Sequence, residues 1–526
     1  MTIPTLTQGA MFSVIFVLLL YAFFTLGKRL WHRRRGVNLP GPKGIPIFGN
    51  TFQIPLVAPW IKFTEWAAIY GDIYFLSALG MKIVVINSCE IGFDLLHKRG
   101  VIYSDRPRMT VIREYGGWTF ALSAEPYGED FHLKRRMINQ YFNRSASVKH
   151  QSMLAENAKA FASSLLDHPT EFQSQNRMYT GANIMSITYG HKVTSNDDEW
   201  VVNAKEAIRT LECLGGPGVH PIDIWPILGK LPLRLWGKKF VRNVGLMKKA
   251  AERTTTLPYN IVKAKYFDGT ALPSMATGLI EANLMSDGSI KNEDAINGVL
   301  AMTYIAGADT TVGSLDTFII AMIHFPEIQR EAQRTIDEFL HGERLPSFED
   351  RGSLPYVEAL YREVLRWKPV LPAGVPHRSV QDDVYQGMFI PAGSMIFFNM
   401  LAMMYNPREF PDPSKFDPGR FLEYDGRDRR YSLRSDVRNP EDMAFGFGRR
   451  ICPGRHFASA WIWITMTTIL ACFEILPARD ESGFGEVRLP GVEYDKGPIS
   501  HPKAFRCVLR AREGGVWRLL SSAGSN

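Results

Sequence analysis

Apolar residues first gather into a continuous stretch at 10–26, which carries no charged side chain. Its length lies at the lower end of what a helix needs to span a membrane, about 17–25 residues. A basic cluster at 28–35 follows directly, whereas a cleaved signal peptide carries its positive charge before the apolar stretch. The pattern predicts a membrane-anchoring helix over 9–27. By the positive-inside rule, residues 1–8 then lie in the lumen and the rest of the chain in the cytosol.

Prolines and glycines dominate the stretch that comes next. Proline fixes the backbone and removes a donor, so residues 28–50 are expected to form a basic, stiff and non-helical linker. Beyond it, the hydrophobic pattern is that of one large domain, 51–512, with a short tail at 513–526.

Within this domain most of the periodicity is helical. Stretches rich in β-branched and aromatic residues predict strands at 73–76 and 83–87, and further strands within 384–397. Helices are predicted at 90–99, over most of 150–295, and at 298–325, 354–367 and 456–473. The expected fold class is therefore mainly α with small β-sheets.

Composition narrows the class of protein. The chain has 526 residues, of which 45% are hydrophobic and 22% charged, as in a globular protein with a sizeable core. The formal net charge of +8 is unevenly spread, because residues 1–43 hold six basic side chains and no acidic one. The remainder is close to balanced and has no basic stripe with interleaved aromatic residues. No nucleic-acid partner is therefore expected.

The cysteines exclude two further classes of protein. They are odd in number, far apart in the chain, and form no Cys-x-x-Cys pair. This argues against a disulfide framework and against a structural zinc site. The five cysteines are Cys89, Cys213, Cys452, Cys472 and Cys507.

One of them, Cys452, stands in a glycine-punctuated loop that runs from Phe445 to Gly454. Gly446 and Gly454 let the backbone turn tightly and approach a flat ligand closely. The helix predicted just after the cysteine directs its positive dipole end at the sulfur, and Arg450 adds positive charge. Both favour a thiolate. The plain alternative is a buried free cysteine at a turn.

The middle of the apolar helix 298–325 carries polar residues that are costly to bury. Asp309 and Thr310 stand side by side among apolar neighbours, and an acid there needs a partner. Gly307 costs about 1 kcal/mol relative to alanine in a helix interior. These costs point to a function. The alternative for Thr310 is a hydrogen bond back to the preceding turn.

The loop pattern Phe-x-x-Gly-x-Arg-x-Cys-x-Gly closely resembles the haem-binding loop of the cytochromes P-450, the cysteine-ligated haem monooxygenases. The resemblance covers about residues 36–510, with the main motifs in order. It implies that haem b lies between the long central helix and the cysteine-loop helix. Cys452 would be the axial ligand of the iron, and Phe445, Gly446 and Gly454 would shape the cofactor-binding loop.

The same resemblance assigns partners to the haem propionates. Phe131 and Arg135 match a family segment in which an aromatic residue and an arginine four positions on bind a propionate; the aromatic is usually tryptophan. Arg378 matches an arginine that contacts a propionate, and Arg450 is a third cation available for this role. A last turn, 491–502, would line the pocket.

Two further motifs acquire a role through the resemblance. Asp309 and Thr310 match the oxygen-activation motif, in which the threonine hydrogen-bonds to oxygen and the acid relays protons. Glu363 and Arg366 match the family's Glu-x-x-Arg, which a downstream arginine, here Arg420, locks into a structural triad.

The implied activity is oxidation of a hydrophobic small molecule with O2 and NADPH-derived electrons. Because the chain has no flavin- or nicotinamide-binding unit, a separate NADPH–cytochrome P-450 reductase is expected, with cytochrome b5 as an optional second donor. The motifs look like those of fungal enzymes of secondary metabolism, with terpenoids slightly favoured, on the endoplasmic reticulum membrane. Two alternatives stay open: an isomerase or dehydratase that uses no reductase, and a non-catalytic haem-binding or sensor protein.

Overall fold

The computed structural model describes residues 37–195, 197–214, 218–426, 430–478, 489–513 and 520. The predicted anchor at 9–27 and the lumenal segment 1–8 lie outside these residues. Within the described part of the chain, no helix is long and apolar enough to cross a membrane. The division into anchor, linker, domain and tail stays a prediction.

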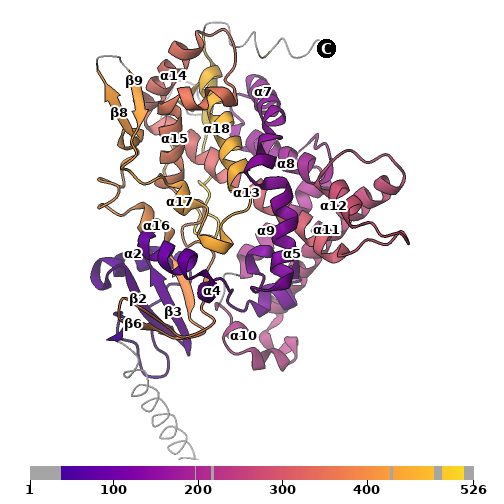
Figure 1. The fold of residues 1–526 in the computed structure, drawn as a ribbon, viewed down its shortest axis with the longest axis vertical. Helices are drawn as coiled ribbons and strands as arrows, with labels where there is room; N and C mark the ends of the chain where they lie inside the picture. Colours follow the sequence, from indigo (N-terminus) through magenta and orange to yellow (C-terminus); the bar gives the residue numbers. More distant parts are fainter. Residues whose placement is uncertain are drawn as a thin grey trace, which may run out of the picture.

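Helices make up most of the described chain, as the periodicity predicts (Figure 1). They are α2 (Pro59–Tyr70), α3 (Cys89–Gly92), α4 (Gly100–Tyr103), α5 (Glu129–Phe142), α6 (Arg144–Val148), α7 (Gln151–Asp167), α8 (Phe172–Tyr189), α9 (Glu199–Leu214), α10 (Pro221–Ile224), α11 (Lys238–Phe267), α12 (Met275–Asn283), α13 (Glu293–His324), α14 (Pro326–Leu340), α15 (Pro355–Trp367), α16 (Met400–Met404), α17 (Glu441–Ala444) and α18 (Arg455–Cys472).

Short helical turns connect these elements. Two are π-helical, η1 (Phe93–Lys98) and η2 (Val111–Tyr115). The others are 3-10 turns: η3 (Trp118–Phe120), η4 (Leu122–Ala124), η5 (Pro226–Lys230), η6 (Leu233–Trp236), η7 (Phe348–Ser353), η8 (Pro418–Phe421) and η9 (Gly448–Arg450).

In the part of the chain that the structure describes, the strands form four small sheets. They are β1 (Val37–Asn38), β2 (Ile73–Ala78), β3 (Met81–Ile86), β4 (His377–Arg378), β5 (Asp383–Tyr385), β6 (Met388–Ile390), β7 (Met395–Phe398), β8 (Leu422–Asp425), β9 (Arg430–Leu433), β10 (Phe473–Pro477) and β11 (Cys507–Ala511). The sheet orders are β2-β3-β7-β4, β1-β6-β5, β8-β9 and β10-β11. The two strands predicted at 73–76 and 83–87 pair as the antiparallel hairpin β2–β3, with Ile73 opposite Ile86.

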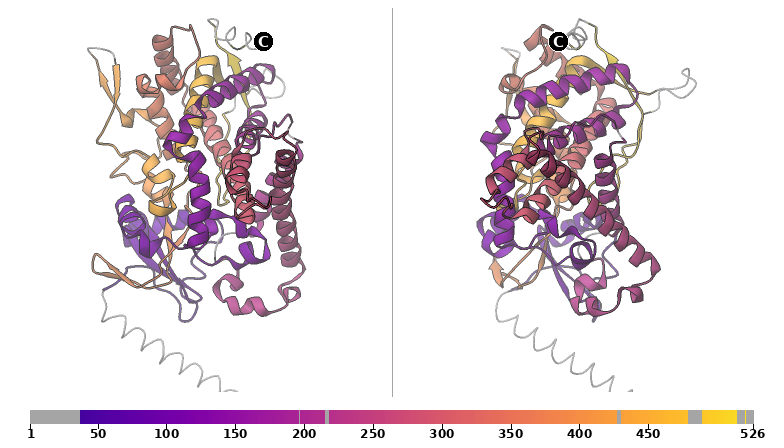
Figure 2. Two further views of the ribbon diagram at one scale, coloured as in Figure 1. Left: turned by 45° about the vertical axis from the view of Figure 1, so that its right-hand side comes forward. Right: turned by 90° about the vertical axis from the view of Figure 1, so that its right-hand side faces the viewer.

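The long helix α13 is the centre of the fold. It is apolar on all sides, as expected of a helix that other elements surround. It packs against α8, α5, α11 and α18. Figure 2 shows this arrangement from two further sides, with α18 in yellow beside α13. The two elements predicted to enclose the site, the central helix and the cysteine-loop helix, therefore touch.

One predicted helix is irregular. The pattern at 90–99 predicts a single helix, but the chain forms α3 and then widens into the π-helical turn η1. Gly92 lies at this junction, and a side chain there would meet the ring of Phe447 at 3.1 Å. The cysteine loop therefore packs directly on this irregular segment.

Candidate active site

The cysteine loop is closed on itself and seated on η1. The Cys452 amide donates to the Phe445 carbonyl at 2.8 Å. Gly446 and Gly448 have φ values of 75° and 56°, a left-handed conformation that favours glycine. A Cβ at Gly448 would lie 2.1 Å from the Leu96 carbonyl oxygen, so only glycine fits this contact. The loop geometry is therefore held by backbone contacts on both sides.

The surroundings of Cys452 act in opposite directions on the pKa of its thiol. Burial raises the pKa of the thiol, while the Gly454 amide and the charges of Arg135 and Arg455 act in the opposite direction. These groups favour the thiolate but do not outweigh its desolvation. A metal ion with which the sulfur could bond would complete the stabilisation, and thiolate is a ligand that haem iron accepts.

Open space adjoins both the loop and the middle of α13. A Cβ at Gly446 or at Gly454 would meet no atom within 4 Å. On α13, Ala306 is exposed and residues 307–310 are half-buried, although the turns on either side are buried. The donor chemistry of Cys452 and these open surfaces fit a large, flat, iron-containing group such as haem.

Arg450 is buried, and its guanidinium is held by backbone carbonyls. It donates to Ser104 at 2.7 Å, to Glu125 at 2.7 Å and to Leu122 at 3.4 Å. Its charged group also stacks on the ring of Phe131, 3.8 Å from the centroid. Phe131, where the family resemblance leads us to expect tryptophan, thus has a partner within the protein. The contacts tie the cysteine loop to the segment before α5.

Arg135 lies on α5, one turn after Phe131 and on the same face of the helix. Its side chain is half-buried, and no carboxylate of the described residues forms an ion pair with it. Burial lowers the pKa of Arg135, and the sulfur of Cys452 acts against this shift. Arg135 is therefore a cation near the cysteine whose guanidinium could form an ion pair with an anionic ligand.

Arg106 is a buried cation that sequence reasoning missed. Its Nη1 donates to the carbonyls of Val375 at 2.5 Å and Pro376 at 2.7 Å, while its Nε has no partner among the described residues. Burial, and then the charge of Arg450, lower its pKa. A buried guanidinium without an acidic partner calls for an anion. Only its position directly before a proline distinguishes it in the sequence, which is too weak a signal.

The two residues of strand β4, His377 and Arg378, point in opposite directions. His377 points inward and is buried, with Nδ1 at 2.7 Å from the Tyr103 carbonyl. Burial and the charge of Arg106 lower its pKa, so the ring is neutral and Nδ1 is the donor. Arg378 points outward, and its Nη1 lies 3.3 Å from Asp105 Oδ2. The structure therefore brings His377, and not the predicted Arg378, beside Arg106, because side chains alternate along a strand.

Asp309 and Thr310 occupy the half-buried turn of α13. The Thr310 hydroxyl donates to the Ala306 carbonyl at 2.9 Å, the bond that the plain alternative predicts. Since the hydroxyl hydrogen is used there, the oxygen can only accept from the open side. Asp309 has a buried partner, because its Oδ2 lies 3.2 Å from Nε2 of His501.

The three residues of the predicted triad are in contact. Glu363 and Arg366 on α15 form a two-bond ion pair of 2.7 and 2.8 Å, with both side chains fully buried. Arg420 on η8 donates to the same carboxylate at 3.2 Å. Arg366 also donates to the carbonyls of Met404 and Pro413. This cluster joins α15 to the chain that precedes the cysteine loop.

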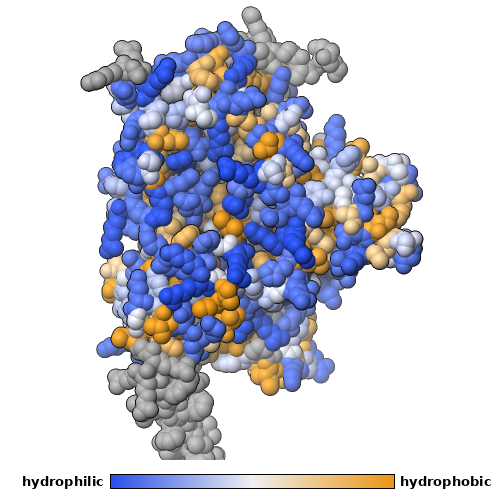
Figure 3. All heavy atoms as spheres, in the orientation of Figure 1, coloured by the Kyte–Doolittle hydropathy of each residue, from blue (hydrophilic) through white to orange (hydrophobic). Residues whose placement is uncertain are grey.

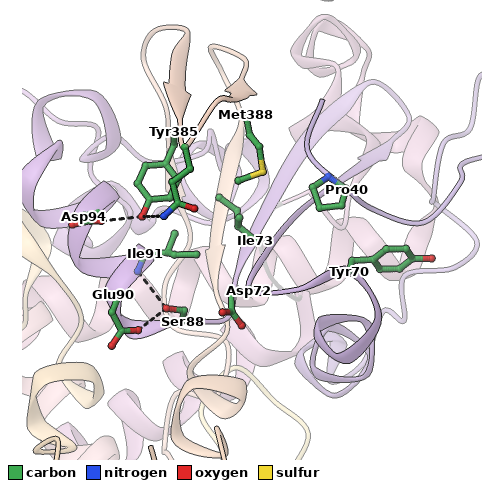
Figure 4. Close-up of a pocket in the computed structure, with 11 residues that line it drawn as sticks. Pro40, Tyr70, Asp72, Ile73, Ser88, Glu90, Ile91, Asp94, Tyr385 and Met388 are labelled. Atoms are coloured by element: carbon green, nitrogen blue, oxygen red, sulfur yellow. Dashed lines mark hydrogen bonds between the residues drawn. The ribbon is translucent and has the colours of Figure 1, made fainter. Parts of the chain in front are cut away.

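A separate surface cavity of about 500 Å³ lies between α3, η1 and the β5–β6 turn (Figure 4). It contains none of the predicted site residues. Its carboxylates are already partnered: Tyr385 donates to Asp94 at 2.9 Å, and Ser88 donates to Glu90 at 2.7 Å. The cavity therefore offers no second chemical centre.

Comparison with known proteins agrees with the site geometry. The family model described as cytochrome P-450 matches residues 39–484. Cytochrome P-450 monooxygenase 105 of Postia placenta is 35% identical over 97% of this chain and 94% of its own length. Cytochrome P-450 monooxygenase ple1 of Rhodocybe pseudopiperita is 36% identical over 90% of this chain and 89% of its own. The chain therefore belongs to the cytochrome P-450 family and is an oxidoreductase of the monooxygenase type.

Proposed function

We propose that this protein binds haem b through Cys452 and oxidises a hydrophobic small molecule with O2 and electrons from an NADPH–cytochrome P-450 reductase. The observation that carries the proposal is the placement of Cys452, with Arg135 near its sulfur, in a loop bordered by open space. Haem held there would supply the iron at which O2 is activated, with one oxygen atom going to the substrate and the other, with two electrons and two protons, to water.

Several residues would hold the propionates of the cofactor. Arg106 and Arg135 have no ion pair with an acidic side chain of the described residues, and His377 lies beside Arg106. Arg450 would act mainly by holding the loop, since backbone carbonyls accept from its donors. Arg378 keeps its proposed role only if it leaves Asp105.

Thr310 and Asp309 would manage protons on the open side of α13. The Thr310 oxygen can accept a hydrogen bond there, which would orient water or bound oxygen. Asp309 is the neighbouring acid and has its own buried partner, so it can hold or release a proton at a defined position.

The triad of Glu363, Arg366 and Arg420 would be structural. It lies in the interior, with Arg366 and Glu363 fully buried, and its contacts are made with the protein itself. Its role would be to hold α15 in place against the chain that leads to the cysteine loop.

Electrons would enter on the side of Cys452. Exposed basic residues there include Arg449 on the loop and Arg136 on α5, next to the half-buried Arg135. Such charges favour an acidic partner surface and raise the rate of encounter. We propose the reductase as the main partner and cytochrome b5 as an optional second one.

We also propose that the protein is anchored in the endoplasmic reticulum membrane. The sequence pattern at 9–27 is the main support, and two groups of exposed apolar residues add to it. One lies near α2 and the other near α10: Ile47, Phe52, Leu56, Val57, Trp225, Ile227 and Leu235. Orange patches gather at this end of the molecule in Figure 3. In Figure 1, α10 lies at the same end as β6, which pairs with β1 at the start of the described chain.

For the substrate we propose a product of fungal secondary metabolism, with terpenoids as the first class to test. The support is the fungal origin of the relatives and the sequence motifs.

Two measurements test the proposal. The reduced, CO-bound protein should show the red-shifted Soret band of thiolate-ligated haem, and Cys452→Ser should lose that band. Co-expression with a reductase in a host that makes candidate scaffolds should give products heavier by one oxygen, detected by mass spectrometry. A product that forms without reductase would favour an isomerase or dehydratase, and haem without turnover would favour a sensor.

A further inference from the structure

A turn near the C-terminus is fixed against the middle of the central helix. Tyr494 and Pro502 face each other as an antiparallel bridge, and the Ser500 amide donates to the Val370 carbonyl at 2.8 Å. These contacts hold the turn at both ends. Its residue His501 is buried, with 7% of its surface exposed.

The two ring nitrogens of His501 have different surroundings. Nε2 lies 3.2 Å from Oδ2 of Asp309, and both side chains are largely enclosed, at 9% and 13% exposure. Nδ1 is buried and has no partner among the described residues. It faces Gly313, one turn along α13 from Asp309, where an added Cβ would come within 3.3 Å of this nitrogen. Gly313 thus leaves the room that the imidazole occupies.

The charges that act on His501 are few. Asp309 and Asp316 come from α13, and Arg177 comes from α8. Burial lowers the pKa of His501, but the hydrogen bond and charge of Asp309 act against it, and the pKa lies above its ordinary value. Asp316 is itself buried, which raises its pKa to about 6, and Asn176 donates to it at 2.8 Å. The carboxylate of Asp309 thus favours the protonated form of the ring, against the effect of burial.

We propose that His501 is a positioning residue for proton delivery: its Nε2 holds the carboxylate of Asp309 beside Thr310. This inference rests on the proposed function and concerns how proton delivery at the same site is controlled. A proton that moves from Nε2 to Oδ2 converts imidazolium and carboxylate into imidazole and carboxylic acid. Asp309 passes that proton to the oxygen being reduced on the open side of α13 and returns to carboxylate, and the ring takes up one proton from bulk solvent, so that one proton is delivered per cycle.

The pH dependence follows from the sign of the shift. Below the raised pKa of His501 the ring is a cation that attracts the carboxyl group of Asp309. As the pH rises through that pKa, the ring loses its positive charge and this attraction is lost. Proton delivery should then weaken, and more of the consumed NADPH should appear as peroxide instead of product.

The first test measures His501 without turnover. The holoenzyme is labelled with 13C-histidine, reduced and bound to CO, so that it is diamagnetic and its absorbance reports thiolate-ligated haem in the same tube. His501→Gln identifies the signal among the 12 histidines. We expect a titration midpoint above about 6.5 that falls by about one pH unit or more in Asp309→Asn. A midpoint at or below 6.5 that Asp309→Asn does not move would overturn the inference.

The second test measures the ratio of product to NADPH consumed across pH. In the native enzyme this ratio should fall as the pH passes the midpoint measured for His501. His501→Gln keeps a donor but cannot titrate, so its ratio should be several-fold lower at neutral pH and flat. His501→Lys, which restores a cation, should recover part of the ratio. Asp316→Asn should leave the falling profile in place.

The control variant is Lys503→Gln, which removes an exposed cation from the same segment. It should match the native profile. If His501→Gln also matches the native profile while its absorbance shows intact thiolate-ligated haem, the inference is wrong and the proposed function stands. If the native protein itself lacks that absorbance, the proposed function fails first, and the two failures are distinct.

Discussion

The buried carboxylate of Glu363 offers the sharpest test of how the fold is held, through the substitution Glu363→Gln. The carboxylate accepts hydrogen bonds from Arg366 at 2.7 and 2.8 Å, from the Asp417 amide at 2.8 Å and from Arg420 at 3.2 Å. Glutamine keeps one acceptor oxygen and turns the other position into a donor. That NH2 group would face a guanidinium, which also only donates.

The size of the effect follows from burial. Arg366 and Glu363 are both at 0% exposure, so the loss of the negative charge leaves a desolvated cation without its counter-ion. Breaking one side of a buried pair costs about 3–5 kcal/mol, whereas an exposed ion pair contributes about 0–1 kcal/mol. The carbonyls of Met404 and Pro413 still accept from Arg366, so we expect a value toward the lower end of the larger range.

The assay is unfolding in urea, followed by far-UV circular dichroism and by haem absorbance. Glu363→Gln should lower the midpoint clearly and release haem early, because the triad supports the chain that leads to the cysteine loop. The matched control is Glu65→Gln, which removes the charge of an exposed pair with Lys62 and should change the midpoint little. A loss of less than about 1 kcal/mol in Glu363→Gln would refute the argument from burial.

Three other substitutions test the site. Gly448→Ala should destabilise the haem-loaded protein by about 1–3 kcal/mol, since its Cβ would lie 2.1 Å from the Leu96 carbonyl; an unchanged melting temperature would contradict this. Thr310→Ala should retain haem but divert reducing equivalents to peroxide, and unchanged coupling between NADPH and product would remove Thr310 from the mechanism. Arg106→Leu should lower the haem content of the purified protein, while Arg378→Gln should not; the reverse pattern would restore Arg378 as the propionate partner.

How much the sequence could predict depends on the range of the interaction. Cys452 and its glycines form a local pattern, in which positive φ values and a close backbone approach each demand glycine. Glu363 and Arg366 share a helix face at spacing i, i+3, so their contact follows from the period of the helix. Arg420 joins them only through the resemblance to a family, since no local spacing links it to α15.

Contacts between distant parts of the chain have the opposite character. Arg378 is expected at a propionate, but which residue of β4 faces inward depends on which face of the sheet the tertiary structure buries, and here Arg378 lies beside Asp105. The guanidinium of Arg106 is fixed by hydrogen bonds to the carbonyls of Val375 and Pro376, which lie far along the chain. A single sequence carries no signal for a contact of this kind.

The amino-acid sequence alone therefore determined the class of fold, the cysteine loop and the chemistry that a thiolate and an acid–alcohol pair can support. Those features depend on backbone conformation, helix period and residue type, which act over a few positions. The tertiary structure decided which cations face inward, that Phe131 stacks on Arg450, and that His501 meets Asp309 across 192 positions. Such pairs are set by how helices and turns pack, because burial makes each polar group find its partner wherever the fold places one.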